Sequence, residues 1–484
     1  MRPLPVITAV ALATAFTAAS AQAVVSQGVF RIGADAMWAH GIDGTGQTVA
    51  VVDMGFADIE QSIAAGELPA MDEMTVKSFD AVNGIRGKDQ LEATTAHGVR
   101  MAEIIHDVAP GAHLVLVNYH SDDEFVQATR WIAANGIPIV SHSNSLLGGP
   151  FDGTGPLARA VDGAAAAGVL WVNSSGNFAK RHWRGTADAA GVVIPVAPQP
   201  NETLAFGIGW SGAGVDAVVS VERQAEDGSW AEVARSDSTR RTPPVTVEGG
   251  AWRAVVRQVA GDAVPLDVFS RTVGLGAMAV ADGSIATPGD AAGSLTVGAA
   301  NWGDLTVADY SSRGPTEDGR QKPEIVGPTY VTSNLSFPGT GGTSASTPHV
   351  AAAAALLRQQ RALAGQPSDA TALRSALTAA ARDIGTRGVD AASGAGMVRV
   401  DFAPPLVRLG VGAGARRVIT AQALDDGTMN SLTMTLDGRQ VTRALGPFAR
   451  YRTPVLKKGR HRIAVQAQDS AGNITSVTRT VRVR

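Results

Sequence analysis

Residues 341–348 read Gly-Gly-Thr-Ser-Ala-Ser-Thr-Pro and lead into an apolar, alanine-rich stretch from His349 to Leu357. The stretch predicts a helix that begins within the quoted residues, because a proline in the first turn loses no helical hydrogen bond. Ser344 then lies between small residues at a helix N-terminus, where developing negative charge is stabilised. We take Ser344 as a candidate nucleophile. A Gly-rich turn before a buried helix is the alternative interpretation.

A serine hydroxyl needs a base, and the base needs an acid that orients it. Among nine histidines, only His97 has a suitable context, at the start of the amphipathic stretch 99–107. The apolar run 47–53 ends in Asp53 and predicts a buried parallel strand, whose C-terminal end is where α/β proteins place chemistry. A strand-ending Asp that caps a turn is the ordinary alternative for Asp53.

A second buried strand, 169–175, runs into Gly176-Asn177. An asparagine amide at such a turn can donate a hydrogen bond to a tetrahedral oxyanion, which contributes about 3 kcal/mol. Asparagine also tolerates positive φ in turns, and this is the structural alternative.

The order Asp53, His97, Asn177, Ser344 resembles the subtilisin-like serine proteases (subtilases). Four blocks carry the resemblance: Val-Ala-Val-Val-Asp53-Met-Gly, Ala-His97-Gly-Val, Ser-Ser-Gly-Asn177 and Gly-Thr-Ser344-Ala-Ser-Thr-Pro. The stretch 310–326 also resembles the family segment that precedes the Ser block. The resemblance covers roughly residues 30–400, with a long interruption. Met54, Ser346 and residues 327–329 depart from the usual pattern without removing a catalytic group.

The resemblance implies a Ser-His-Asp triad of Ser344, His97 and Asp53, with Asn177 in the oxyanion hole. It also implies that substrates add to an exposed strand edge. Ser145, Leu146 and Gly148 lie in the segment that resembles this edge, and we assign them to substrate binding. A simple strand-to-loop transition is the alternative for this segment.

Composition restricts the function classes. The 484 residues contain no cysteine, which excludes disulfides and cysteine catalysis, and the formal net charge of −3 gives no footprint for nucleic acid. We expect no cofactor for the chemistry and assign no metal ligands. Structural calcium is common in the resembled family, but no loop here has dense acidic spacing.

The N-terminus predicts export. An apolar run from Val6 to Ala19 precedes Ala21-Gln22-Ala23, a small-x-small cleavage site, so residues 1–23 are predicted to be a signal peptide. We expect no membrane span, because no segment is long and apolar enough. The product is expected to be secreted, extracellular or periplasmic, and to fold without an N-terminal propeptide.

The sequence predicts an α/β fold with a mostly parallel central sheet flanked by helices. Residues 24–202 and 281–402 form the predicted subtilisin-like peptidase domain. Alternating strands with recurrent turns predict an inserted β-sandwich or jelly-roll domain at 203–280 and a C-terminal immunoglobulin-like β-sandwich at 403–484. The insertion either selects substrates or elaborates the surface. Basic residues of 403–484 suggest attachment to an acidic cell surface or polymer; a solvated spacer is the alternative.

We therefore expect a secreted serine endopeptidase that acts on protein or peptide substrates. Two other functions stay open. A sedolisin-like acid peptidase would use a carboxylate as its base and Asp in the oxyanion hole, which His97 and Asn177 disfavour. A non-catalytic binding or adhesion protein on a protease scaffold would not need these four residues intact.

Overall fold

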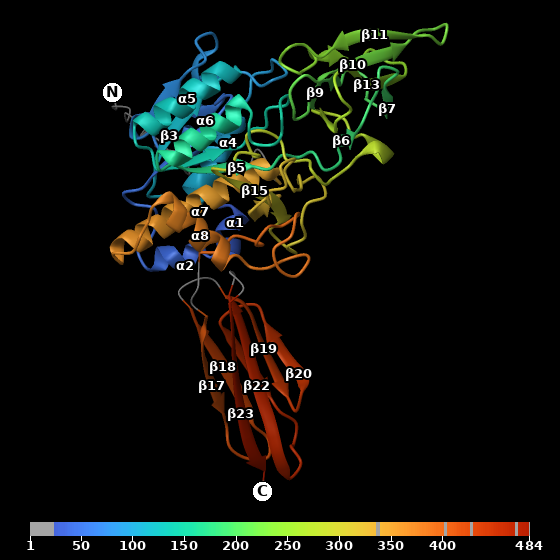
Figure 1. The fold of residues 1–484 in the computed structure, drawn as a ribbon. Coiled ribbons are helices and arrows are strands. Elements are labelled where there is room, and N and C mark those ends of the chain that lie inside the picture. Colours follow the sequence, from blue (N-terminus) through green and yellow to red (C-terminus); the bar gives the residue numbers. More distant parts are fainter. Residues whose placement is uncertain (1–23, 335–338, 401–403, 426–428, 470–472, 484) are drawn as a thin grey trace, which may run out of the picture.

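The computed structural model describes residues 24–334, 339–400, 404–425, 429–469 and 473–483 (Figure 1). The predicted signal peptide, residues 1–23, lies outside the described residues, as does the predicted domain boundary between 402 and 403.

A seven-stranded parallel sheet forms the centre of the fold. Its strand order is β16-β15-β5-β4-β1-β3-β2. The strands are β1 (Thr48–Asp53), β2 (Thr75–Ser78), β3 (His113–Asn118), β4 (Ile139–His142), β5 (Leu170–Ser174), β15 (Ser294–Asn301) and β16 (Ile325–Thr329). The strands predicted near residues 50, 115, 139 and 170 are confirmed.

Helices cover both faces of this sheet (Figure 1). They are α1 (Gln27–Ile32), α2 (Ala34–Ala39), α3 (Ile59–Ala65), α4 (His97–Val108), α5 (Asp122–Ala134), α6 (Pro156–Ala166), α7 (Thr343–Leu363) and α8 (Ala370–Ala380), with short 3₁₀ helices η1 (Met71–Glu73), η2 (Gly84–Arg86) and η3 (Gly276–Met278). The predicted α/β architecture, with a mostly parallel sheet between helices, is confirmed.

Alternation along β1 shows how the strand holds both layers. Val49 and Val51 belong to the core under α4 and α7, whereas Ala50 and Val52 belong to the core under α5 and α6. A strand that is buried on both faces has apolar residues at consecutive positions, as residues 49–52 do. Asp53 follows this run and stands where the strand leaves the sheet.

A second group of strands is antiparallel and shares its own core (Figure 1, green). The four-stranded sheet β11-β10-β13-β7, the three-stranded sheet β6-β14-β9 and the pair β12-β8 compose it. The strands are β6 (His182–Gly185), β7 (Val192–Val196), β8 (Thr203–Leu204), β9 (Phe206–Gly209), β10 (Asp216–Gln224), β11 (Trp230–Arg235), β12 (Val245–Thr246), β13 (Trp252–Ala260) and β14 (Leu266–Ser270).

This antiparallel group includes two strands that precede residue 203. β6 pairs with β14 and β7 pairs with β13. Strand pairing does not by itself define a domain, so the boundaries at 202 and 281 stay a prediction.

The C-terminal residues form two further antiparallel sheets, β17-β18-β21 and β20-β19-β22-β23. Buried residues of both sheets, including Ile419, Leu432 and Ile463, share one core. The strands are β17 (Leu406–Val411), β18 (Val418–Leu424), β19 (Met429–Leu436), β20 (Arg439–Ala444), β21 (Phe448–Arg452), β22 (Gly459–Asp469) and β23 (Ile474–Val483). Antiparallel sheets in this region were expected; the immunoglobulin-like assignment stays a prediction.

The described residues lack both a helix that could span a membrane and a metal-binding cluster of side chains. None of their helices is both long enough and apolar enough to cross a bilayer. The same residues contain no cluster of three or more His, Asp or Glu side chains suited to holding a metal ion.

Candidate active site

Asp53 is the last residue of β1, and its side chain is 1% exposed. One carboxylate oxygen, Oδ2, accepts a hydrogen bond from His97 Nδ1 at 2.7 Å, and the other, Oδ1, accepts from the Met54 backbone N–H at 2.8 Å. Both oxygens are therefore engaged, which fixes the carboxylate plane toward the imidazole. The sequence-predicted pair of Asp53 and His97 is in contact.

His97 is the first residue of α4. The helix starts here because the His97 N–H donates to Thr95 Oγ1 at 3.1 Å and the Gly98 N–H donates to the Gly55 carbonyl at 3.0 Å. A Cβ atom at Gly98 would lie only 2.6 Å from the Phe56 ring. Glycine at this position thus lets the helix start pack against the end of β1, which brings the imidazole to the carboxylate.

The environment of His97 adjusts its protonation. Burial alone lowers the pKa of His97, but the charge of Asp53 and its hydrogen bond outweigh burial, so the pKa is raised above its ordinary value of 6.5. Because Asp53 accepts the Nδ1 proton, the neutral imidazole keeps its lone pair on Nε2. That tautomer is the one a general base requires.

Ser344 is the second residue of α7. Its hydroxyl donates to the Ser143 carbonyl at 3.0 Å, and the Ser143 hydroxyl donates back to the Ser344 carbonyl at 3.0 Å. Within the described part of the chain, no hydrogen bond joins Ser344 to His97. The two side chains line one cavity of about 160 Å³, and catalytic hydrogen bonds are often loose before substrate arrives. A rotation of the hydroxyl away from Ser143 is needed before proton transfer.

Asn177 lines the same cavity, and its amide has a defined orientation. The backbone N–H and the hydroxyl of Thr343 both donate to Asn177 Oδ1, at 2.9 and 3.1 Å. Donation to the oxygen leaves the Nδ2 hydrogens for another acceptor. A Cβ atom on Gly342 would lie 3.2 Å from Nδ2, so the glycine keeps space beside this donor. The amide can therefore serve an oxyanion.

The predicted substrate-binding residues have different surroundings. Ser145 lines the cavity with Ser344, and its carbonyl accepts from Arg271 Nη2 at 3.2 Å. Leu146 is 1% exposed, and its N–H donates to the Thr287 carbonyl at 2.8 Å. A Cβ atom at Gly148 would lie 2.5 Å from the Thr239 carbonyl. Leu146 and Gly148 thus contact other parts of the chain, and their role in substrate binding stays a prediction.

Sequence reasoning missed several residues at this site. Thr343 orients Asn177, Ser143 holds the Ser344 hydroxyl, and the cavity is also lined by Phe178, Arg181 and Arg271. Thr343 lies within the block around Ser344, and Ser143 lies two residues before the predicted substrate-binding segment, so their neighbourhood was a usable signal. Nothing in the local sequence of Arg271, which follows the last strand of the antiparallel group, points to the cavity.

Comparison with known proteins identifies the family of this chain. A family model described as peptidase S8, Subtilase family, matches residues 44–396, which include Asp53, His97, Asn177 and Ser344. The chain belongs to the subtilase family.

One curated relative matches part of this subtilase. The chain is 34% identical over 152 residues to the serine protease AprX of Bacillus subtilis (strain 168), a match over 26% of this chain and 31% of AprX. It thus spans about a third of the length of that curated relative. The solved structure of the Clostridium perfringens CspB protease is similar in fold, with a TM-score of 0.53 and 15% identity over 77% of this chain and 95% of that chain.

Proposed function

We propose that this subtilase is a secreted serine endopeptidase that hydrolyses protein or peptide substrates through a triad of Ser344, His97 and Asp53. The observation that carries the proposal is the 2.7 Å hydrogen bond between His97 and Asp53, which leaves Nε2 of the imidazole to accept a proton within a cavity shared with Ser344. Family membership supports the same chemistry.

The residues divide the reaction between them. His97 takes the hydroxyl proton as Ser344 Oγ attacks the peptide carbonyl carbon, and Asp53 stabilises the imidazolium that forms. The Asn177 amide and the Ser344 backbone N–H bind the oxyanion. His97 then protonates the leaving amine, and water hydrolyses the acyl-enzyme with His97 again as the base.

A fluorophosphonate probe tests the proposal directly, because it reacts with an activated serine. We expect labelling of wild-type protein at Ser344, found by peptide mass spectrometry, and cleavage of a denatured protein substrate at neutral to alkaline pH. An optimum at acid pH would favour the sedolisin-like chemistry. Absence of both labelling and cleavage would favour a non-catalytic binding protein.

We also propose export with cleavage after Ala23, which would make Val24 the mature N-terminus. Support comes from the surroundings of Val24, whose nitrogen lies 3.2 and 3.1 Å from the two carboxylate oxygens of Glu67. Glu67 is 5% exposed, and burial raises its pKa. Burial also raises the pKa of nearby Asp107 to about 9. An α-ammonium at Val24 would add the positive charge that these buried carboxyl groups need.

This processing proposal predicts that the exported protein begins at Val24 and depends on Glu67. Loss of one charged hydrogen-bond partner costs about 1.5–3 kcal/mol, so Glu67→Gln is expected to lower the melting temperature of mature protein. N-terminal sequencing and thermal unfolding check both points. A mature N-terminus well beyond Val24, or an unchanged melting temperature, would contradict the proposal.

For the C-terminal sheets we propose an immunoglobulin-like attachment module. Exposed basic side chains support attachment to an acidic surface or polymer, among them Arg416, Arg450, Arg452, Lys457, Lys458 and Arg460. Deletion of residues 403–484 is then expected to release the enzyme from the producing cells into the medium, measured as activity per fraction. Equal distribution of the full-length and shortened proteins would leave the spacer interpretation.

A further inference from the structure

The cavity beside Ser344 carries two cations whose role in the reaction is unassigned. Arg181 and Arg271 line it together with Ser145, Asn177 and Ser344. A peptide whose scissile carbonyl lies between Ser344 Oγ and Asn177 Nδ2 must place the side chain of its acyl residue close by, because that side chain begins two bonds from the carbonyl carbon. The cavity is therefore the space that this side chain would enter.

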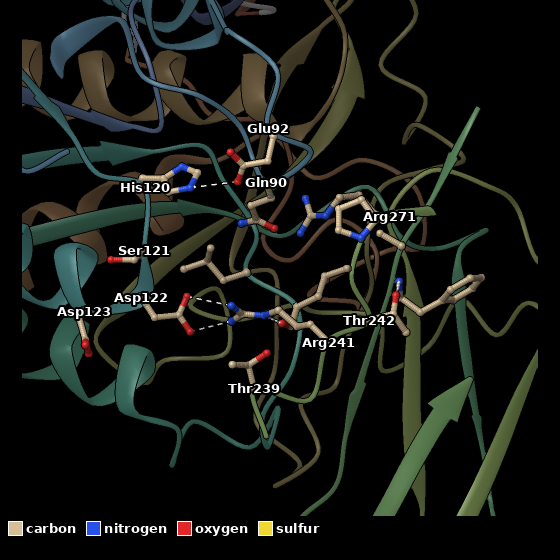
Figure 2. A pocket seen from close by; sticks show the side chains of 15 residues that line it. Gln90, Glu92, His120, Ser121, Asp122, Asp123, Thr239, Arg241, Thr242 and Arg271 are labelled. Carbon is tan, nitrogen blue, oxygen red and sulfur yellow. Dashed lines mark hydrogen bonds and ion pairs between the residues drawn. The ribbon is translucent and has the colours of Figure 1, made fainter. Parts of the chain in front are cut away.

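The backbone holds both arginines firmly. The Ser270 N–H donates to the Arg181 carbonyl at 2.8 Å, and the Arg271 N–H donates to the Ala205 carbonyl at 2.9 Å. Arg181 Nη1 in turn donates to the Arg271 carbonyl at 3.0 Å, and Arg271 Nη2 donates to the Ser145 carbonyl at 3.2 Å. Both guanidinium groups thus donate to neutral carbonyl groups, and Arg271 also lines the neighbouring cavity drawn in Figure 2.

Neither arginine forms an ion pair with a carboxylate in the described ranges. Arg241, in the loop between β11 and β12, differs from them: its guanidinium pairs with both oxygens of Asp122, at 3.0 and 2.8 Å (Figure 2). The carboxylates that act on the two cavity arginines from further away are Asp89 for Arg271 and Glu202 for Arg181.

Both distant carboxylates accept hydrogen bonds from backbone N–H groups of their own loops. Asp89 Oδ1 accepts from the backbone N–H groups of Leu91 and Ala93, and Glu202 Oε2 accepts from that of Gln199. Burial, and then the charge of Arg241, lower the pKa of Arg271 to about 10, so it stays charged at neutral pH. A desolvated cation without a counter-ion is costly, and an anion in the cavity would relieve that cost.

From this geometry we infer that the cavity selects substrates with an acidic side chain, Asp or Glu, at the residue whose carbonyl is attacked, with Arg271 and Arg181 as the specificity-determining residues. The inference rests on the proposed endopeptidase function. It gives the antiparallel strands a part in substrate choice, because Arg271 directly follows β14. Guanidinium groups suit this task, since their planar fork matches a carboxylate.

Matched peptides test the selection. Two quenched fluorescent peptides should differ only in Glu or Gln before the cleaved bond. We expect wild type to show a kcat/KM at least about 10-fold higher for Glu, and Arg271→Gln to reduce that ratio to roughly 1–3. Arg181→Gln should change the ratio in the same direction. The control Arg235→Gln, on the edge strand β11 and paired with Glu232, should keep the wild-type ratio.

Two further measurements distinguish failure of this inference from failure of the proposed function. Fluorophosphonate labelling of each arginine variant shows that its active site is folded. Binding of the same peptides to Ser344→Ala, followed by fluorescence anisotropy, should favour the Glu peptide about 10-fold without any cleavage. Equal binding, or equal kcat/KM for Glu and Gln in wild type, overturns the inference and leaves the proposed function. No cleavage with preferential Glu binding overturns the proposed function and keeps the acidic selectivity of the cavity.

Discussion

Replacing Ser344 with alanine is expected to lower kcat for peptide hydrolysis about 10⁶-fold, because removal of the attacking oxygen abolishes the acyl-enzyme route. The backbone should be little disturbed. The lost hydroxyl makes one hydrogen bond, to the Ser143 carbonyl, and the Ser143 hydroxyl still donates to the carbonyl of residue 344. Cleavage of a quenched fluorescent peptide measures kcat, and far-ultraviolet circular dichroism checks the fold.

Ser346 offers a matched control two residues along α7. It is buried, and its hydroxyl donates to the Pro328 carbonyl at 3.2 Å. Ser346→Ala should cost about 1 kcal/mol of stability and retain activity near the wild-type level. If Ser344→Ala kept more than about a hundredth of wild-type kcat, the nucleophile would have to be another group.

Replacing Asp53 with asparagine is expected to lower kcat about 10⁴-fold. An asparagine amide can present N–H to His97 Nδ1, which puts the imidazole proton on Nε2 and removes the lone pair that must accept the Ser344 proton. The isosteric side chain should keep the protein folded, since one of its atoms can still accept from the Met54 N–H.

The same residue sets the direction of the pH dependence. The pKa of His97 is raised above 6.5 in the folded protein by Asp53, against the effect of burial. Protonated His97 cannot act as a base, so wild-type activity should rise with pH and reach half its plateau above pH 6.5. The protonated pair stabilises the fold below the unfolded pKa, and that contribution is lost as pH rises through the folded pKa.

Asp53→Asn removes the charge that raises the pKa, so the acid limb of the residual activity should move to lower pH. Profiles of kcat/KM between about pH 5 and pH 10 measure the limb for both proteins. An acid limb at the same pH in both proteins would mean that another group controls it. Activity that decreases as the pH rises from acid values would favour a carboxylate base. Either outcome would refute His97 as the base.

Short motifs carried much of what could be predicted. Apolar runs with a period typical of buried strands predicted β1, β3, β4 and β5, and the proline-bearing run after Ser344 predicted α7. The chemistry of Asp53 and His97 was predictable because Asp53 ends one of these strands and His97 begins a helix. Asp53 lies at the C-terminal end of its strand and His97 at the N-terminal end of its helix. Parallel strands have their C-terminal ends at one edge of the sheet, which brings such residues together.

Packing between distant segments decided the rest. Strand periodicity tells which face a residue takes, but it does not tell which distant residue lies opposite. The cavity position of Arg271, the contact of Gly148 with Thr239 and the approach of Val24 to Glu67 all depend on how the segments dock. The amino-acid sequence therefore determined the reactive groups and the parallel sheet that supports them. Only the tertiary structure decided the hydrogen bond of the Ser344 hydroxyl and the charge of the cavity beside it, because both depend on groups brought together from segments far apart in the sequence.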